Sequence, residues 1–181
     1  MILPIAVYGH PVLRQIAQPI TKDYPSLEQL IKDMWATMYR TDGIGLAAPQ
    51  VGLSIRLIVI DLDVFKDEYP ELKGFKRVFI NPQIELLPSK SVSFSEGCLS
   101  IPGIHKKVRR QDKIRVHYQD EEFNPHTIDF EGFASRVIQH EYDHLEGKLF
   151  VDYLNLLDRL LIQYKLRSIT NGKTQASYKV M

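Results

Sequence analysis

The stretch Gln139-His140-Glu141-Tyr142-Asp143-His144-Leu145-Glu146-Gly147 decides how the rest of this chain is interpreted. On an α-helix His140 and His144 lie one turn apart on the same face, so both imidazoles can bind one metal ion. Glu141 follows the first histidine, where its carboxylate can take a proton from a water on that metal. The alternative is two unrelated histidines on a solvated helix. Two histidines do not complete a metal site, so another segment must provide a third ligand.

Length and composition are typical of one globular domain with a sizeable core, and the chain has 181 residues. A formal net charge of +1 gives no overall attraction to DNA or to an acidic surface. Cys98 is the only cysteine, which rules out an internal disulfide and favours a reducing compartment. No apolar run is long enough to span a bilayer, and the first residues lack a signal-peptide pattern. We therefore expect a cytoplasmic protein that binds neither DNA nor a membrane.

A helix is predicted in the N-terminal part, because apolar residues recur there at helical spacing and form one core-facing stripe. Ser26 and Gln29 have the spacing of a capping box at its start, and Gly43 marks the region of its end. The stripe consists of Leu27, Leu30, Ile31, Met34 and Met38.

The middle of the chain predicts antiparallel sheet, because short apolar or alternating runs are separated by brief turns. The segment 63–75 is polar, contains Pro70 and Gly74, and is predicted to be an exposed loop. The predicted strands cover residues 56–61, 78–87, 91–94, 114–118 and 127–130.

Gly132 and Gly147 are placed to begin and end the helix that carries the two histidines. A last helix is predicted from Asp152, as its N-cap, through Tyr164, and a variable polar tail follows from about residue 167. We therefore expect one α+β domain over residues 1–181. In it, antiparallel β-sheets pack around a central metal-binding helix, with one further helix near each end of the chain.

Cys98 is the candidate third ligand. A lone cysteine is usually a small buried apolar side chain. Beside an H-E-x-x-H sequence, however, its thiolate can complete a site whose fourth position is left for water.

Three stretches, taken together, resemble the motifs of the bacterial peptide deformylases in order and in spacing, over roughly residues 2–160. They are Gly43-Ile44-Gly45-Leu46-Ala47-Ala48-Pro49-Gln50, Glu96-Gly97-Cys98-Leu99-Ser100 and His140-Glu141-Tyr142-Asp143-His144. The resemblance implies a hydrolase that removes the formyl group from the N-terminal methionine of new polypeptides and releases formate. Its substrates would be formyl-methionyl nascent peptides, and a transient contact with the ribosome is compatible with that role.

The resemblance also implies the roles of individual residues. Cys98, His140 and His144 would bind the metal. That metal would be Fe2+, with Zn2+, Ni2+ or Co2+ also able to occupy the site, although the residues alone suggest zinc. Glu141 would be the acid and base of the reaction. The Gln50 side chain and the Leu99 backbone N–H would stabilise the oxyanion.

Substrate binding is expected along the glycine-rich stretch, where the peptide can pair as an added strand beside Gly43, Ile44 and Gly45. Val137 either lines the methionine pocket or simply packs in the core. Many relatives carry an arginine where this chain has His105, which leaves open how the peptide backbone is bound there.

Several neighbouring groups have two interpretations. Glu96 and Arg110 either brace the cysteine loop or form an exposed ion pair of little energetic value. Asp143 either binds a ligand imidazole or faces solvent. The basic run 106–110 is interpreted as a solvated strand edge rather than as an RNA contact.

Two other functions fit the H-E-x-x-H sequence. A zincin-type endopeptidase also uses this glutamate, but an upstream cysteine as third ligand argues against it. A structural metal module needs four protein ligands and has no use for Glu141 or Gln50.

Overall fold

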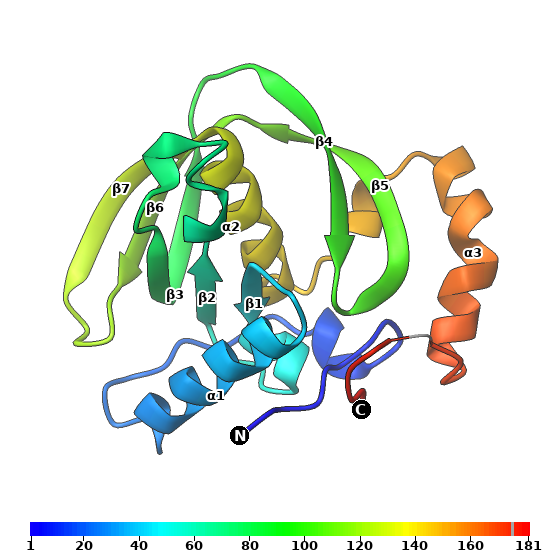
Figure 1. Cartoon of the computed structure of the whole chain (residues 1–181), viewed down its shortest axis with the longest axis horizontal. Coiled ribbons are helices and arrows are strands. Elements are labelled where there is room, and N and C mark those ends of the chain that lie inside the picture. Colours follow the sequence, from blue (N-terminus) through cyan, green and yellow to red (C-terminus); the bar gives the residue numbers. More distant parts are fainter. Residues whose placement is uncertain (175) are drawn as a thin grey trace.

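The computed structural model describes residues 1–174 and 176–181 and has an α+β fold whose central element is helix α2, Gly132–Leu145 (Figure 1). A five-stranded antiparallel sheet with the order β1-β2-β3-β6-β7 lies on one side of α2, and the separate β4–β5 hairpin lies on the other. The strands are β1 Gly45–Ala47, β2 Leu57–Asp61, β3 Lys76–Leu86, β4 Ser91–Cys98, β5 Ile101–Gln111, β6 Lys113–Gln119 and β7 Pro125–Glu131.

The predicted antiparallel sheet around a central helix is therefore confirmed. Two strands are longer than the sequence indicated. Strand β4 continues past the run 91–94 to Cys98, and β5 begins at Ile101, before the run 106–110. Within the described residues, no helix is both long and apolar enough to cross a lipid bilayer.

Strand β2 explains how the sheet separates two parts of the core. Ile58 and Ile60 point into the cluster that packs against α2, whereas Leu57 and Val59 point into the cluster beneath helix α1, Leu27–Arg40. Successive side chains of a strand face opposite sides, so a strand covered on both faces needs apolar residues at every position. This is why residues 57–60 form a continuous apolar run.

Helix α1 has the predicted position but not the predicted cap. Ser26 adopts a left-handed conformation with φ 54°, and its side chain makes no capping hydrogen bond. Gln29 does not reach back either, because its amide donates to Asp33 at 2.9 Å. The capping-box prediction was wrong, because the Ser26 backbone is left-handed rather than extended as in a usual N-cap.

The segment 63–75 is mostly exposed, as predicted, but it is more than an irregular loop. It contains two short 3-10 helices, Asp63–Phe65 and Pro70–Leu72, and Leu72 and Phe75 are buried. The rings of Phe65 and Tyr69 lie 5.0 and 5.4 Å from the ring of Phe133 at the start of α2. A few apolar side chains thus cover the helix, although the average polarity of the segment is that of a loop.

The last helix begins later than predicted. Asp152 lies in a 3-10 helix, Phe150–Tyr153, and accepts a hydrogen bond from the Leu149 N–H at 2.8 Å. Helix α3 runs over Leu156–Thr170, and its N-cap is Asn155, whose side chain accepts from the Asp158 N–H at 2.9 Å. Both residues are good N-caps, and the competing 3-10 turn uses the first of them.

The two glycines that bound α2 have different steric demands. Gly132 and Gly147 both have positive φ, 61° and 65°. A Cβ on Gly147 would lie 2.8 Å from the backbone carbonyl oxygen of Arg14, whereas nothing lies within 4 Å of a Cβ on Gly132. The end of α2 is therefore packed tightly against the N-terminal segment.

We predict that Gly147→Ala destabilises the protein by about 2–4 kcal/mol, since it adds this clash to the cost of a left-handed alanine. Gly74→Ala is the matched control: its φ is 73° with nothing within 4 Å, so it should lose only about 1 kcal/mol. Urea unfolding of the two variants measures the difference. Equal losses would show that the contact with Arg14 is not restrictive.

Candidate metal centre and active-site pocket

Cys98, His140 and His144 come together as predicted, and their ligand atoms all lie within 4.8 Å of one another. His140 and His144 project from one face of α2, and the Cys98 Sγ lies 3.3 Å from the Nε2 of His144. One ion can therefore contact all three groups. A thiolate and two imidazoles leave a fourth tetrahedral position open, which is the arrangement of a catalytic rather than a structural site.

The β4–β5 hairpin brings Cys98 to α2. Cys98 pairs with Ile101, so Leu99 and Ser100 form a two-residue turn, and the pairing register shifts between Glu96 and Cys98. Residues two apart on a strand lie on the same face of it. Both Glu96 and Cys98 can thus face the helix.

Glu96 fixes the first histidine. Its Oε2 lies 2.9 Å from the Nδ1 of His140. Because a carboxylate can only accept, Nδ1 donates and Nε2 keeps its lone pair for a metal. Arg110 donates to both oxygens of Glu96 at 2.7 and 2.9 Å, and Arg136 adds a third bond at 3.0 Å.

Of the two interpretations of Glu96 and Arg110, the buried brace is confirmed. Burial alone would raise the pKa of the Glu96 carboxyl, but the hydrogen bonds from Arg110 and His140 outweigh it and hold that pKa well below its usual range. Glu96 is therefore a carboxylate whenever the protein is folded at neutral pH.

Asp143 follows neither of its predicted alternatives. It is buried and accepts hydrogen bonds from Arg110 at 2.7 Å and from the Tyr153 hydroxyl at 2.8 Å. Asp143 thus binds the nitrogen of the Arg110 guanidinium that Glu96 does not bind. The solvated-edge interpretation of residues 106–110 was consequently wrong at Arg110, although Lys107 and Arg109 are exposed. A charged residue on a strand can be buried when other elements provide its hydrogen-bond partners. The alternation of residues along the strand gives no information about those partners.

Glu141 lies beside Gly45. A Cβ on Gly45 would lie 2.6 Å from the Glu141 carboxylate, so only glycine lets β1 pass this close to α2. Burial raises the pKa of Glu141 to about 7. Among the described residues nothing hydrogen-bonds to its Oε2, and the same holds for the buried Nδ1 of His144. A buried carboxylate without a partner is costly, so this oxygen suits a ligand in the pocket.

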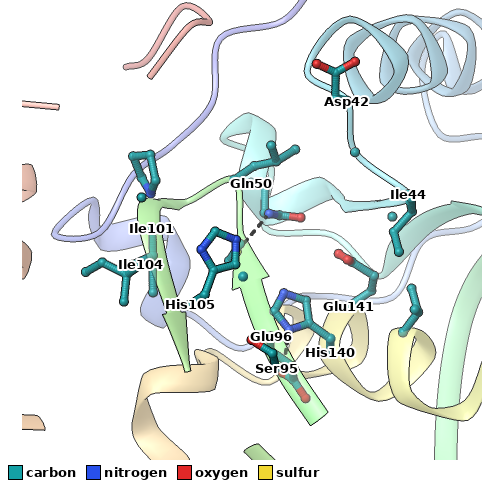
Figure 2. Close-up of a pocket in the computed structure, with 18 of the residues that line it drawn as sticks. Asp42, Ile44, Gln50, Ser95, Glu96, Ile101, Ile104, His105, His140 and Glu141 are labelled. Carbon is teal, nitrogen blue, oxygen red and sulfur yellow. Dashed lines mark hydrogen bonds and ion pairs between the residues drawn. The ribbon is translucent and has the colours of Figure 1, made fainter. Parts of the chain in front are cut away.

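Gln50 approaches from the side opposite α2, on the 3-10 helix Ala48–Val51 (Figure 2). Its Oε1 accepts from the Ala47 N–H at 2.9 Å, which fixes the amide and directs Nε2 toward the cysteine loop. Nε2 lies 3.5 Å from the Cys98 Sγ and 3.4 Å from the Ser100 Oγ. The side chain thus offers a donor at the metal centre.

A pocket of about 530 Å³ opens at these groups. All of the residues predicted for substrate binding, namely Gly43, Ile44, Gly45 and Val137, line it together with Gln50, Leu99, His140 and Glu141. Val137 lines this pocket and is also part of the core cluster beneath the sheet. His105 lies at the same pocket, and its ring would be 2.5 Å from a Cβ on Gly97.

Sequence reasoning missed some lining residues. Phe133 and Arg136 are two of them, although Arg136 is four residues before His140 and helical spacing could have identified it. Ala176, Ser177 and Tyr178 also line the pocket, and no local signal in the tail pointed to this.

The comparisons with known proteins agree with this geometry. Residues 2–160 match the sequence model of the polypeptide deformylase family. The chain belongs to this family. A peptide deformylase of Christiangramia forsetii is 50% identical to it over 187 residues, which cover 99% of this chain and 95% of that protein.

Solved structures give the same result. The crystal structure of peptide deformylase from Thermus thermophilus is 38% identical and superimposes with a TM-score of 0.83, covering 96% of this chain and 100% of that one. The peptide deformylase from Synechococcus elongatus in complex with actinonin has the same identity and a TM-score of 0.78, covering 99% of this chain and 92% of that one.

The predicted function is thereby confirmed at the level of the family. The chain is a metal-dependent hydrolase of the peptide deformylase kind, which removes the N-formyl group from nascent polypeptides. The endopeptidase and the structural metal module are not the functions of this family.

We predict that Glu96→Gln weakens metal binding about 10- to 100-fold, because the neutral amide holds His140 less firmly and leaves two arginines without their carboxylate. Competition with a chelator measures the affinity. Glu131→Gln, which removes an exposed partner of Lys113, is the control and should bind metal as the parent does. Equal affinities of the two variants would contradict the role of Glu96 in holding His140.

Proposed function

We propose that Cys98, His140 and His144 hold a catalytic Fe2+ in this deformylase, and that Glu141, Gln50 and Leu99 act on the formyl group. The observation that supports the proposal is the position of Glu141 in the same pocket as the converging ligands. Its buried Oε2 has no hydrogen-bond partner in the described part of the chain. A structural site would leave such a carboxylate without purpose.

The donor set supports a transition metal. When bound, such a metal lowers the pKa of a coordinated water and polarises the formyl oxygen. A thiolate is a soft ligand and suits iron, while Zn2+, Ni2+ and Co2+ accept the same three donors.

Glu141 moves the proton in this proposal. Its carboxylate takes a proton from the attacking water and then delivers it to the nitrogen of the leaving amine, so that formate and a free methionine amine are released. A carboxyl whose pKa lies near 7 can both accept and return a proton at neutral pH, and burial raises the pKa of Glu141 to about that value.

Gln50 and Leu99 supply donors to the oxyanion. The Gln50 amide is held by Ala47 before substrate arrives, and Leu99 follows Cys98 in a tight turn, so neither donor has to reorganise as charge develops.

The substrate peptide would pair with β1. Strand β1 lies at one edge of the sheet, and Gly45 at its start lines the pocket together with the preceding Gly43 and Ile44. Pairing through the main chain tolerates different downstream sequences, which suits an enzyme that acts on many nascent chains. The methionine side chain would lie against Ile44 and Val137.

We further propose that residues 1–181 act as one catalytic domain in the cytoplasm, where its reduced Cys98 is preserved and its substrate emerges from the ribosome. Contact with the ribosome itself would be transient.

Formate release from a formyl-methionyl tripeptide tests the proposal, with protein purified without oxygen and loaded with Fe2+. The parent should turn over rapidly, and Glu141→Ala should be about 10²- to 10⁴-fold slower because general acid–base catalysis is lost. Glu122→Ala, on an exposed turn, should equal the parent. A fully loaded parent that releases no formate would disprove the proposal.

A chelator gives the second arm of this experiment. Removal of metal should abolish formate release, and adding back Fe2+ should restore it in the parent and not in Glu141→Ala. Activity that persists without metal would contradict the role of the three ligands.

A further inference from the structure

The C-terminal segment Ala176–Met181 returns to the active site, and the mechanism above makes no use of it. Ala176, Ser177 and Tyr178 line the pocket, and the Tyr178 hydroxyl donates to the Leu99 carbonyl oxygen at 2.6 Å. These two residues are 79 positions apart in the sequence. The contact joins the tail to the turn that follows Cys98.

Two backbone hydrogen bonds fix the part of the tail that follows this contact. The Ile5 N–H donates to the Lys179 carbonyl at 2.9 Å, and the Met181 N–H donates to the Ile5 carbonyl at 3.0 Å. Tyr178 itself is half-buried and packs, as Leu99 does, against the cluster beneath helix α1. Its hydroxyl is therefore held in place rather than free to sample solvent.

The bonded carbonyl belongs to the part of the turn that can move. Leu99 and Ser100 are the central residues of the turn between Cys98 and Ile101, so the peptide group between them is the middle one. Rotation of the middle peptide is what distinguishes type I from type II turns. A hydrogen bond to its carbonyl oxygen prevents that rotation and thereby fixes the backbone on either side, including the Leu99 N–H.

The other end of the turn is held as well. The Tyr8 N–H donates to the Ser100 carbonyl at 2.7 Å. Two tyrosines from distant segments, one through its backbone and one through its hydroxyl, thus restrain two successive carbonyls of the turn. Tyr178 is the one that contributes a side chain and can be changed without altering the backbone.

We propose that Tyr178 is a positioning residue for the deformylase reaction, because its hydrogen bond to Leu99 holds the Leu99 N–H toward the oxyanion. This inference rests on the proposed function, in which Leu99 is an oxyanion donor. Since the oxyanion develops only in the transition state, loss of the hydrogen bond lowers kcat and leaves KM unchanged.

The test is Tyr178→Phe, which removes the hydroxyl and keeps the ring that packs against the cluster beneath helix α1. Formate release from a formyl-methionyl tripeptide should show a kcat about tenfold lower, with KM within twofold of the parent. This loss is smaller than the 10²- to 10³-fold that follows removal of a whole oxyanion donor, because the Leu99 N–H is still present. Tyr164→Phe, on the exposed face of α3, is the matched control and should equal the parent.

The iron content of each preparation separates the alternatives. A slower Tyr178→Phe enzyme that retains its full metal content supports positioning. A kcat equal to that of the parent, a change in KM alone, or a loss accounted for by missing iron would each overturn the inference. A parent without activity would instead show that the proposed function has failed.

Discussion

The structure depends on the buried carboxylate of Glu96. An isolated two-stranded hairpin is at best marginally stable in water, so β4 and β5 need an attachment to the rest of the protein. Part of this attachment is the apolar cluster that Ile104 and Val108 of β5 form with segments that follow α2. Glu96 on β4 adds the polar part, because it binds Arg110 on β5 and both His140 and Arg136 on α2. Each buried charge in this group has an opposite partner at hydrogen-bond distance, which is the condition under which burying charges is tolerated. The same network therefore holds the hairpin and orients a ligand.

The network also explains why two carboxylates that line the same pocket have opposite properties. Glu96 is surrounded by cationic donors, and its pKa lies below the usual range. Glu141, on the same helix as His140, faces the pocket without any such donor, and burial raises its pKa to about 7. A permanently charged group and a group that exchanges a proton are thus produced by environment alone. The charged Glu96 is suited to holding its partners in place, and Glu141 is suited to general acid–base catalysis.

What could be predicted from the sequence was local. The spacing of His140 and His144, the continuous apolar run of β2 and the glycines that bound α2 each have their cause within a few residues, and all were predicted correctly. The cap of α3 could not be chosen, because Asp152 and Asn155 are both competent and tertiary packing decides between them. Asp143 shows the same limit, since its partners Arg110 and Tyr153 come from β5 and from the segment after α2.

Another part of the site could not be predicted because it consists of backbone contacts. The N-terminal segment is the best example: the Ala6 N–H donates to the Gln50 carbonyl at 2.8 Å and the Tyr8 N–H to that of Ser100 at 2.7 Å. Any residue except proline can donate such a bond from its backbone N–H, so the amino-acid sequence does not reveal where these bonds form. Yet they fix the relative position of Gln50 and the turn after Cys98, the two places that offer oxyanion donors. The three motifs thus provide the reacting groups and two of their braces, Glu96 and Ala47. Further contacts that hold those groups in register, from Ala6 and Tyr8, come from a segment with no motif at all.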